Sequence, residues 1–301
     1  MLPHKSKTAD EAVGRWPAIL QSLGVDARYL RNRHGPCPLC QGKDRYRFDD
    51  KDGRGTWFCS HCGAGDGFKL LANLFGWAFS HAAKEVDRVC GTVQPGTVTA
   101  ERTTAEKAQV LRSTWQASRT VIAGDPVALY LKRRCDVDAV PPDLRFHPNL
   151  KHPDGGAHPA MLALMRYPDG PAASIHRTYL TDAGEKAAVS TVKMFMQGKS
   201  LKTASVQLST PSGYIAIAEG IETALCAAKR FQLPVWAATN AGLLADWVPP
   251  VGIDRVLIAG DNDHSYTGQN AAFTLARRLS AKGIKCEVRI PDVTGNDWAD
   301  A

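Results

Sequence analysis

Two pairs of cysteines constrain the fold of this chain more than any other feature of its sequence. Cys37 and Cys40 form one Cys-x-x-Cys pair, Cys59 and Cys62 form a second, and eighteen residues separate the pairs. Each pair lets two thiolates meet on one ion, and two pairs complete the tetrahedron of a closed structural zinc site. The spacing therefore predicts a zinc ribbon. A redox Cys-x-x-Cys motif and a chance spacing are the weaker alternatives.

Arginines and aromatic residues alternate between the two cysteine pairs. Arg45, Tyr46, Arg47 and Phe48 follow one another, and Trp57 precedes the second pair. In a strand, successive side chains point to opposite faces, so the guanidinium groups and the aromatic rings separate. Arginines hold phosphates and aromatic rings stack on bases, which predicts that Arg45, Arg47 and Trp57 contact single-stranded DNA. The alternative is that some of these rings form the small core of the ribbon.

Composition is typical of a globular protein with about two domains. The chain has 301 residues, of which 44% are hydrophobic and 22% charged. No apolar run approaches the ~20 residues of a membrane span, and the amino terminus lacks the apolar stretch of a secretory signal. We therefore expect a cytoplasmic protein with no membrane partner. The net charge is +7, and the basic residues predominate in the first two-thirds of the chain, which favours phosphate backbones as ligands.

Periodicity divides the chain into regions of different structure. Helical patterns cover 10–30 and 66–90, and β-like segments separated by Pro, Asp and Gly turns fill 140–210. Strands and helices then alternate to the carboxyl terminus, which predicts a mainly parallel sheet. The predicted fold is α/β, with a small β ribbon, a basic α+β region and a parallel α/β domain. Four segments are predicted: a zinc-ribbon domain (1–92), a linker and helical segment (93–137), a basic β-rich subdomain (138–211) and a catalytic domain (212–301). The flexible stretch 91–104 spans the junction between the first two segments.

Acidic residues follow three apolar stretches in the last third of the chain. Glu219 and Glu222 follow IAIA, Asp261 and Asp263 follow VLIAG, and Asp297 and Asp300 close the chain in DWAD. The carboxyl ends of parallel strands line the crevice where ligands bind. Carboxylates gathered there repel one another unless hard cations lie between them. The pattern therefore predicts a site for Mg²⁺ or Mn²⁺ made by these six acids.

The blocks AEGIETA, DND and DW-x-D together resemble a Toprim domain. The order of zinc ribbon, basic β-rich region and Toprim domain resembles bacterial DnaG-type primases and the primase halves of phage primase–helicases, most closely the phage and plasmid primases. This resemblance covers residues 34–64 and 125–301, and the blocks YLKRR, LRFHP and IHRTYL belong to it. One departure is that the second acid of the first motif lies at Glu222, whereas Thr223 occupies the position of the family's aspartate.

The resemblance implies a DNA primase, a transferase of the primosome that makes short RNA primers on a single-stranded DNA template from NTPs. It implies that Glu219 is the catalytic acid/base or the main metal carboxylate, and that Asp261 and Asp263 bind the metal. It also implies that the basic residues His176-Arg177 and Lys193 hold the phosphates of template and nucleotide. No Walker-type loop is present in the sequence, which predicts a separate replicative helicase as partner.

Two other functions fit the same residues. A Toprim nuclease would use the same carboxylates to direct water onto a phosphodiester bond. A non-catalytic adaptor would bind single-stranded DNA without any reaction, but its sequence would lack the acidic residues, and here they are present. The sequence does not distinguish Asp297 from Asp300 as the metal ligand.

Overall fold

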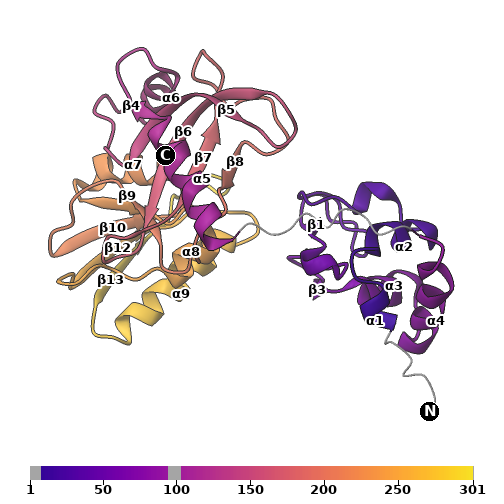
Figure 1. Cartoon of the computed structure of the whole chain (residues 1–301). Coiled ribbons are helices and arrows are strands. Elements are labelled where there is room, and N and C mark those ends of the chain that lie inside the picture. The colour runs from indigo at the N-terminus through magenta and orange to yellow at the C-terminus, as the bar shows by residue number, and fades with distance from the viewer. Residues whose placement is uncertain (1–7, 94–102, 301) are drawn as a thin grey trace. The chain divides into compact units, whose positions relative to one another are not determined.

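The structure, a computed structural model, describes residues 8–93 and 103–300 as two compact units. The greater part of the predicted flexible linker, residues 94–102, lies outside the described residues. The first unit includes the zinc ribbon, and the second contains one large sheet with helices packed on it (Figure 1). This arrangement confirms the predicted mixed α/β fold with an amino-terminal ribbon.

The first unit is a three-stranded ribbon that packs against short helices. Tyr46, Phe48 and Trp57 of the ribbon share one buried cluster with Trp16 and Leu71 of the helices. Contact is so close that a Cβ at Gly67 would lie 2.0 Å from the ring of Trp16. The elements are α1 (Thr8–Glu11), α2 (Trp16–Ser22), β1 (Tyr46–Phe48), β2 (Trp57–Cys59), β3 (Gly63–Gly65), α3 (Gly67–Phe75) and α4 (Phe79–Cys90).

The predicted helix over 66–90 is two helices in the structure. Asp66 caps α3, because its carboxylate accepts a hydrogen bond from the backbone N–H of Lys69 at 2.9 Å. Gly76 ends α3 in the left-handed conformation, with φ of 69°. Glycine adopts this conformation without the steric cost of a Cβ, so it ends a helix that the apolar periodicity alone would continue.

The second unit is built on a ten-stranded sheet with the order β13-β12-β10-β11-β9-β6-β5-β4, with β7 and β8 attached beside β6. The pairs β10–β11, β10–β12 and β12–β13 are parallel, and the other pairs are antiparallel. Its strands are β4 (Arg119–Thr120), β5 (Leu144–Lys151), β6 (Ala157–Arg166), β7 (Ala172–Tyr179), β8 (Lys193–Phe195), β9 (Ser205–Gln207), β10 (Tyr214–Ala218), β11 (Val235–Ala237), β12 (Arg255–Ala259) and β13 (Lys285–Arg289). Its helices are α5 (Thr104–Gln116), α6 (Pro126–Cys135), α7 (Ile221–Phe231), α8 (Ala241–Asp246) and α9 (Thr267–Ser280).

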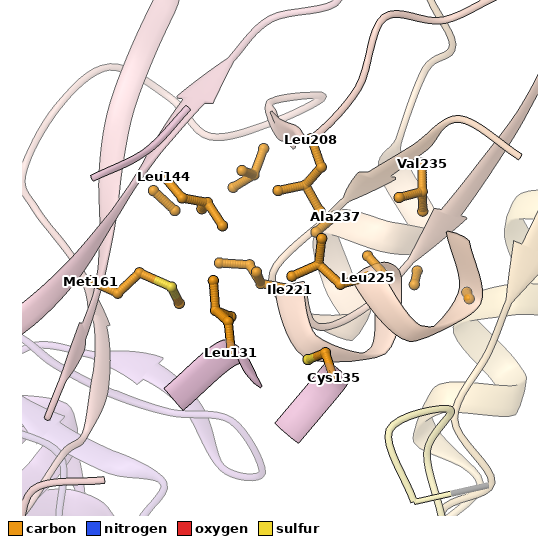
Figure 2. Close-up of a cluster of buried hydrophobic side chains, with 14 of the residues drawn as sticks. Leu131, Cys135, Leu144, Met161, Leu208, Ile221, Leu225, Val235 and Ala237 are labelled. Carbon is orange, nitrogen blue, oxygen red and sulfur yellow. The ribbon is translucent and has the colours of Figure 1, made fainter. Parts of the chain in front are cut away.

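The antiparallel and parallel halves of this unit share one sheet and one core. Strand β9 pairs with β6 on one side and with β11 on the other, so it joins the two halves. Leu131 of α6, Met161 of β6 and Leu225 of α7 lie in the same buried cluster (Figure 2). The predicted boundary between 138–211 and 212–301 therefore falls inside a continuous core.

Within the described residues, no helix is long and apolar enough to cross a membrane.

Candidate metal and nucleotide site

The first feature of the site is the edge of the sheet where three parallel strands end. Glu219 directly follows β10, Asp261 and Asp263 follow β12, and Asp297 lies in the loop that follows β13. Because β10, β12 and β13 are neighbours in that part of the sheet, their carboxyl ends meet at one edge. The structure thus gathers four of the six predicted metal carboxylates at one place.

Glu219 and Asp261 are half-buried, and each has one carboxylate oxygen that is buried and has no hydrogen-bond partner. Burial and the charge of Asp263 raise the pKa of Glu219 to about 7, against the opposing hydrogen bond from the backbone N–H of Ala241. Burial and the charges of Glu219 and Asp297 raise the pKa of Asp261 to about 8. Oε2 of Glu219 and Oδ1 of Asp261 are buried and have no hydrogen-bond partner. Buried polar atoms normally have a partner, so these two oxygens fit a site for a cation.

Backbone contacts hold the loop that carries Asp261 and Asp263. Oδ2 of Asp263 accepts a hydrogen bond from the N–H of Gly268 at the start of α9, at 2.8 Å. A Cβ at Gly268 would lie 2.8 Å from the carbonyl oxygen of Asp261, so the helix approaches the loop as closely as glycine permits. The side chain of Asn262 donates to the carbonyl of Pro291 at 2.7 Å, which ties the second acidic loop to the third.

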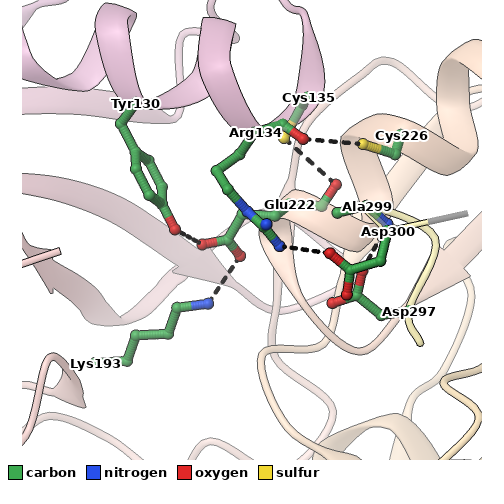
Figure 3. A network of polar contacts seen from close by, with 9 residues as sticks. All are labelled: Tyr130, Arg134, Cys135, Lys193, Glu222, Cys226, Asp297, Ala299 and Asp300. Carbon is green, nitrogen blue, oxygen red and sulfur yellow. Dashed lines mark hydrogen bonds and ion pairs between the residues drawn. The ribbon is translucent and has the colours of Figure 1, made fainter. Parts of the chain in front are cut away.

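Asp297 and Asp300 lie close together but have different partners (Figure 3). The charge of Asp297 raises the pKa of both Glu219 and Asp261, so Asp297 faces the carboxylate site. Asp300 instead pairs with Arg134 of α6, with 3.3 Å between Nη2 and Oδ1 (Figure 3). Of these two acids, the arrangement favours Asp297 as a metal ligand.

Glu222 has a different environment from Glu219. It lies in the first turn of α7 and is 4% exposed. Lys193 of β8 donates to its Oε2 at 2.8 Å, and the hydroxyl of Tyr130 of α6 donates to its Oε1 (Figure 3). These partners hold the pKa of Glu222 at about 2, against the opposing effect of burial. Glu222 is therefore already neutralised by a cation of the chain itself.

The basic residues predicted for phosphate binding lie on strands β7 and β8. Lys193 lies opposite Thr178 in the register of the two strands, and Arg177 pairs with Met194. The guanidinium of Arg177 lies over the ring of Tyr179. His176 is 4% exposed and packs edge-on against Phe195, and burial lowers its pKa to about 4, so its imidazole is neutral at physiological pH.

Tyr130 and Arg134 are site residues that the sequence analysis did not identify. Both lie on α6, and each contacts an acid of the last third of the chain, Glu222 and Asp300 respectively. They are four residues apart, and residues at this spacing lie on the same face of a helix. The block YLKRR contains both residues, but no feature of the sequence shows that α6 packs against α7.

The four cysteines of the first unit form a single cluster. Their sulfur atoms all lie within 4.8 Å of one another, with 3.8 Å between Cys37 and Cys62 and 3.9 Å between Cys40 and Cys59. A Zn–S bond of ~2.3 Å in a tetrahedron places sulfurs about 3.8 Å apart, so the cluster fits one zinc ion. Within residues 8–93 and 103–300, no other group of three or more His, Cys, Asp or Glu side chains has its ligand atoms within 4.8 Å of one another.

The ribbon separates its aromatic and cationic side chains as the alternation predicts, but the aromatic face is the buried one. Trp57 is 1% exposed, and its indole N–H donates to the carbonyl of Asp66 at 3.0 Å. The prediction that Trp57 stacks on bases is therefore wrong, because its ring belongs to the core. Arg45 is exposed and Arg47 half-buried, and Phe58, which lies opposite Arg47 in the strand register, is 46% exposed.

Comparison with protein families gives three matches along the chain. Residues 32–68 match the zinc-binding domain of primase-helicase, and residues 214–301 match the Toprim domain. The chain joins a primase-type zinc ribbon to a Toprim domain. This confirms the resemblance to Toprim-type primases with an amino-terminal zinc ribbon. Residues 105–208, which precede the Toprim domain, match a domain of unknown function (DUF7146).

Solved primase structures are distantly similar to this chain. The zinc-binding and RNA polymerase domains of the Aquifex aeolicus primase share 16% identity over 98% of this chain and 81% of that chain, with a TM-score of 0.44. The primase fragment of the bacteriophage T7 primase-helicase protein shares 14% identity over 89% and 93% of the two chains, with a TM-score of 0.39. A DNA primase domain from Pseudomonas aeruginosa shares 13% identity over 65% and 73%, with a TM-score of 0.41.

Proposed function

We propose that this protein is a DNA primase that synthesises short RNA primers on single-stranded DNA by Mg²⁺-dependent nucleotidyl transfer. The observation that carries the proposal is the group of four carboxylates at the ends of β10, β12 and β13, two of which have buried oxygens without a partner. The pairing of a Toprim domain with a primase-type zinc ribbon supports it.

Glu219, Asp261, Asp263 and Asp297 would hold the metal, because they share one edge of the sheet and their mutual repulsion raises the pKa of Glu219 and Asp261. Bound Mg²⁺ would neutralise phosphate charge and lower the pKa of the attacking 3′-hydroxyl. Lys193, at the border of this site, would bind the triphosphate of the incoming nucleotide. Catalysis would then depend on positioning and on electrostatic stabilisation, as in phosphoryl transfer generally.

One assay tests this function against the alternatives. The full chain is incubated with single-stranded template, labelled NTPs and Mg²⁺, and the products are separated by length. New oligonucleotides a few residues long support the primase. Shortened template would identify a Toprim nuclease, and binding without either product would identify an adaptor.

The outer face of the ribbon would bind the template through Arg45, Arg47 and Phe58. Replacing both arginines by alanine should weaken binding and reduce the slope of log K against log salt concentration by about 1.4, because each phosphate contact on a single strand contributes ~0.7. Replacing Phe58 by alanine should weaken binding by about 1–3 kcal/mol with no change in slope. Fluorescence anisotropy with labelled oligonucleotide at several salt concentrations measures both quantities.

Arg88→Ala is the matched control for the arginine variants. Arg88 lies on α4 in the same unit and pairs with Glu85 at 2.8 Å, outside the ribbon strands. Its replacement should leave the salt slope at the wild-type value. An unchanged slope in the Arg45/Arg47 variant would instead show that these arginines are merely solvated.

A further inference from the structure

Glu222 is a buried carboxylate whose two oxygens each have a partner from a different element. Tyr130 of α6 donates to Oε1, and Lys193 of β8 donates to Oε2 at 2.8 Å (Figure 3). Glu219 and Asp261 differ, because each has a buried oxygen without any partner. A metal ligand needs an oxygen lone pair directed at the ion, whereas both oxygens of Glu222 accept hydrogen bonds from side chains of the protein.

Lys193 connects this buried pair with the carboxylate site. Its side chain is 39% exposed, whereas that of Glu222 is 5% exposed, so the ammonium lies between a buried anion and solvent. Its positive charge also lowers the pKa of both Glu219 and Asp261. Because its partner Glu222 lies three residues after Glu219, at the start of α7, the ammonium lies near the group of carboxylates that would hold the metal.

We propose that Glu222 is a positioning residue for Lys193 and not a ligand of the catalytic metal. Glu222 holds the ammonium beside the carboxylate site, where Lys193 binds the phosphates of the incoming nucleotide. This inference rests on the proposed function, and it reassigns an acid that the sequence pattern places among the metal ligands.

A residue that holds Lys193 in place before the nucleotide binds would increase the affinity for the nucleotide. A free lysine side chain loses rotamer freedom when it binds a ligand, and a partner that fixes it beforehand removes that cost from binding. The ammonium has three N–H donors, so it can keep its bond to Glu222 and still donate to a phosphate. Tyr130 fixes the second oxygen of the carboxylate and thereby sets its orientation.

The test compares Glu222→Gln with Glu219→Gln in the full chain. Glutamine keeps the shape and can still accept a hydrogen bond from Tyr130, but it cannot neutralise Lys193. Electron paramagnetic resonance of free Mn²⁺ measures metal affinity, and calorimetry without template measures the affinity for MgATP. For Glu222→Gln we expect the Mn²⁺ Kd to stay within about twofold of wild type, whereas Glu219→Gln raises it at least about tenfold. Glu222→Gln should raise the Kd of MgATP about tenfold.

A double-mutant cycle with Lys193→Gln isolates the connection between the two residues. If Glu222 acts through Lys193, adding Glu222→Gln to Lys193→Gln changes the Kd of MgATP by less than about twofold. Lys193→Gln alone leaves the buried carboxylate of Glu222 unpaired, whereas the double variant contains no unpaired buried charge, so the double variant should fold even where Lys193→Gln alone melts early. Melting curves of all variants show which of them are folded.

Several results would overturn the proposal. Glu222 would be a metal ligand if its replacement weakened Mn²⁺ binding as much as Glu219→Gln does. It would have no positioning role if MgATP binding were unchanged, or if the two substitutions had independent effects. Failure of the wild-type chain to make primers would reject the proposed activity, whereas the Mn²⁺ and MgATP equilibria would still decide the role of Glu222.

Discussion

Glu219→Gln and Asp261→Asn should each reduce primer synthesis by about 10²–10³-fold or more, because each removes a negative charge from the place where the metal would stabilise the transition state. Affinity for single-stranded template should stay within about threefold of wild type, since the proposed template contacts lie on the ribbon. Primer yield and oligonucleotide anisotropy, measured on the same preparations, check both expectations.

The melting temperature of the metal-free protein distinguishes a variant that has lost a metal ligand from a variant that is misfolded. The charge of Glu219 raises the pKa of the half-buried Asp261 to about 8, so at a pH above 8, where both groups are ionised, neutralising either one should stabilise the metal-free protein. A raised melting temperature, by roughly 2–4 °C for each kcal/mol of repulsion removed, is therefore expected. Addition of Mg²⁺ should stabilise the wild type more than the variants, because a ligand that binds the folded state shifts the unfolding equilibrium.

Asp254→Asn is the matched control. Asp254 precedes β12, at the opposite end of the strand from Asp261, and its side chain is exposed. The same change of charge there should leave primer yield and the effect of Mg²⁺ on melting unaltered. Near-normal primer yield from Glu219→Gln or Asp261→Asn would remove the Toprim assignment of the active site.

Much of the carboxylate site follows from local pattern. Glu219 and Asp261 each follow a short apolar strand, and parallel strands bring their carboxyl ends to one edge, so spacing alone predicts that these acids meet. The distinction between Asp297 and Asp300 does not follow from spacing. It depends on Arg134, which lies far away in the sequence and engages Asp300 because α6 packs against the Toprim domain.

Burial explains the other differences between sequence and structure. An alternating strand shows which residues share a face but not which face is covered, so the pattern could not show that Trp57 is buried and Phe58 exposed. The ribbon turns its aromatic face inward because α2 and α3 supply apolar partners such as Trp16 and Leu71. Likewise, Glu222 lies only three residues after Glu219, and only the three-dimensional contacts with Lys193 and Tyr130 distinguish its environment from that of Glu219.

Removal of zinc should unfold the ribbon and leave the second unit folded. Each ribbon strand has three residues, and Cys37 and Cys59 are themselves part of the buried cluster. Without the ion, four thiols would be held together with no bond between them, and small zinc domains generally lose their structure when the metal is removed. The second unit has its own buried clusters, so its melting transition should be unchanged.

Cys59→Ala should have the same effect as a strong chelator. Trp16 and Trp57 are buried in the first unit, so its unfolding should shift their fluorescence toward the red and expose the ribbon to proteolysis. Elemental analysis should find one zinc per wild-type chain and a markedly reduced content in the variant. Cys286→Ala is the control, because Cys286 lies on β13 of the second unit and belongs to no metal cluster among the described residues.

The helices that pack on the ribbon should unfold together with its strands when zinc is lost. Because the ribbon shares its core with Trp16, Ile19 and Leu20 of α2, loss of the strands should also expose α2 and lower the helical signal of the first unit. If Cys59→Ala loses zinc yet keeps the wild-type melting curve and tryptophan emission, the helices alone hold the ribbon in place. Zinc would then be dispensable for the fold of this unit, and the cysteines would need another explanation.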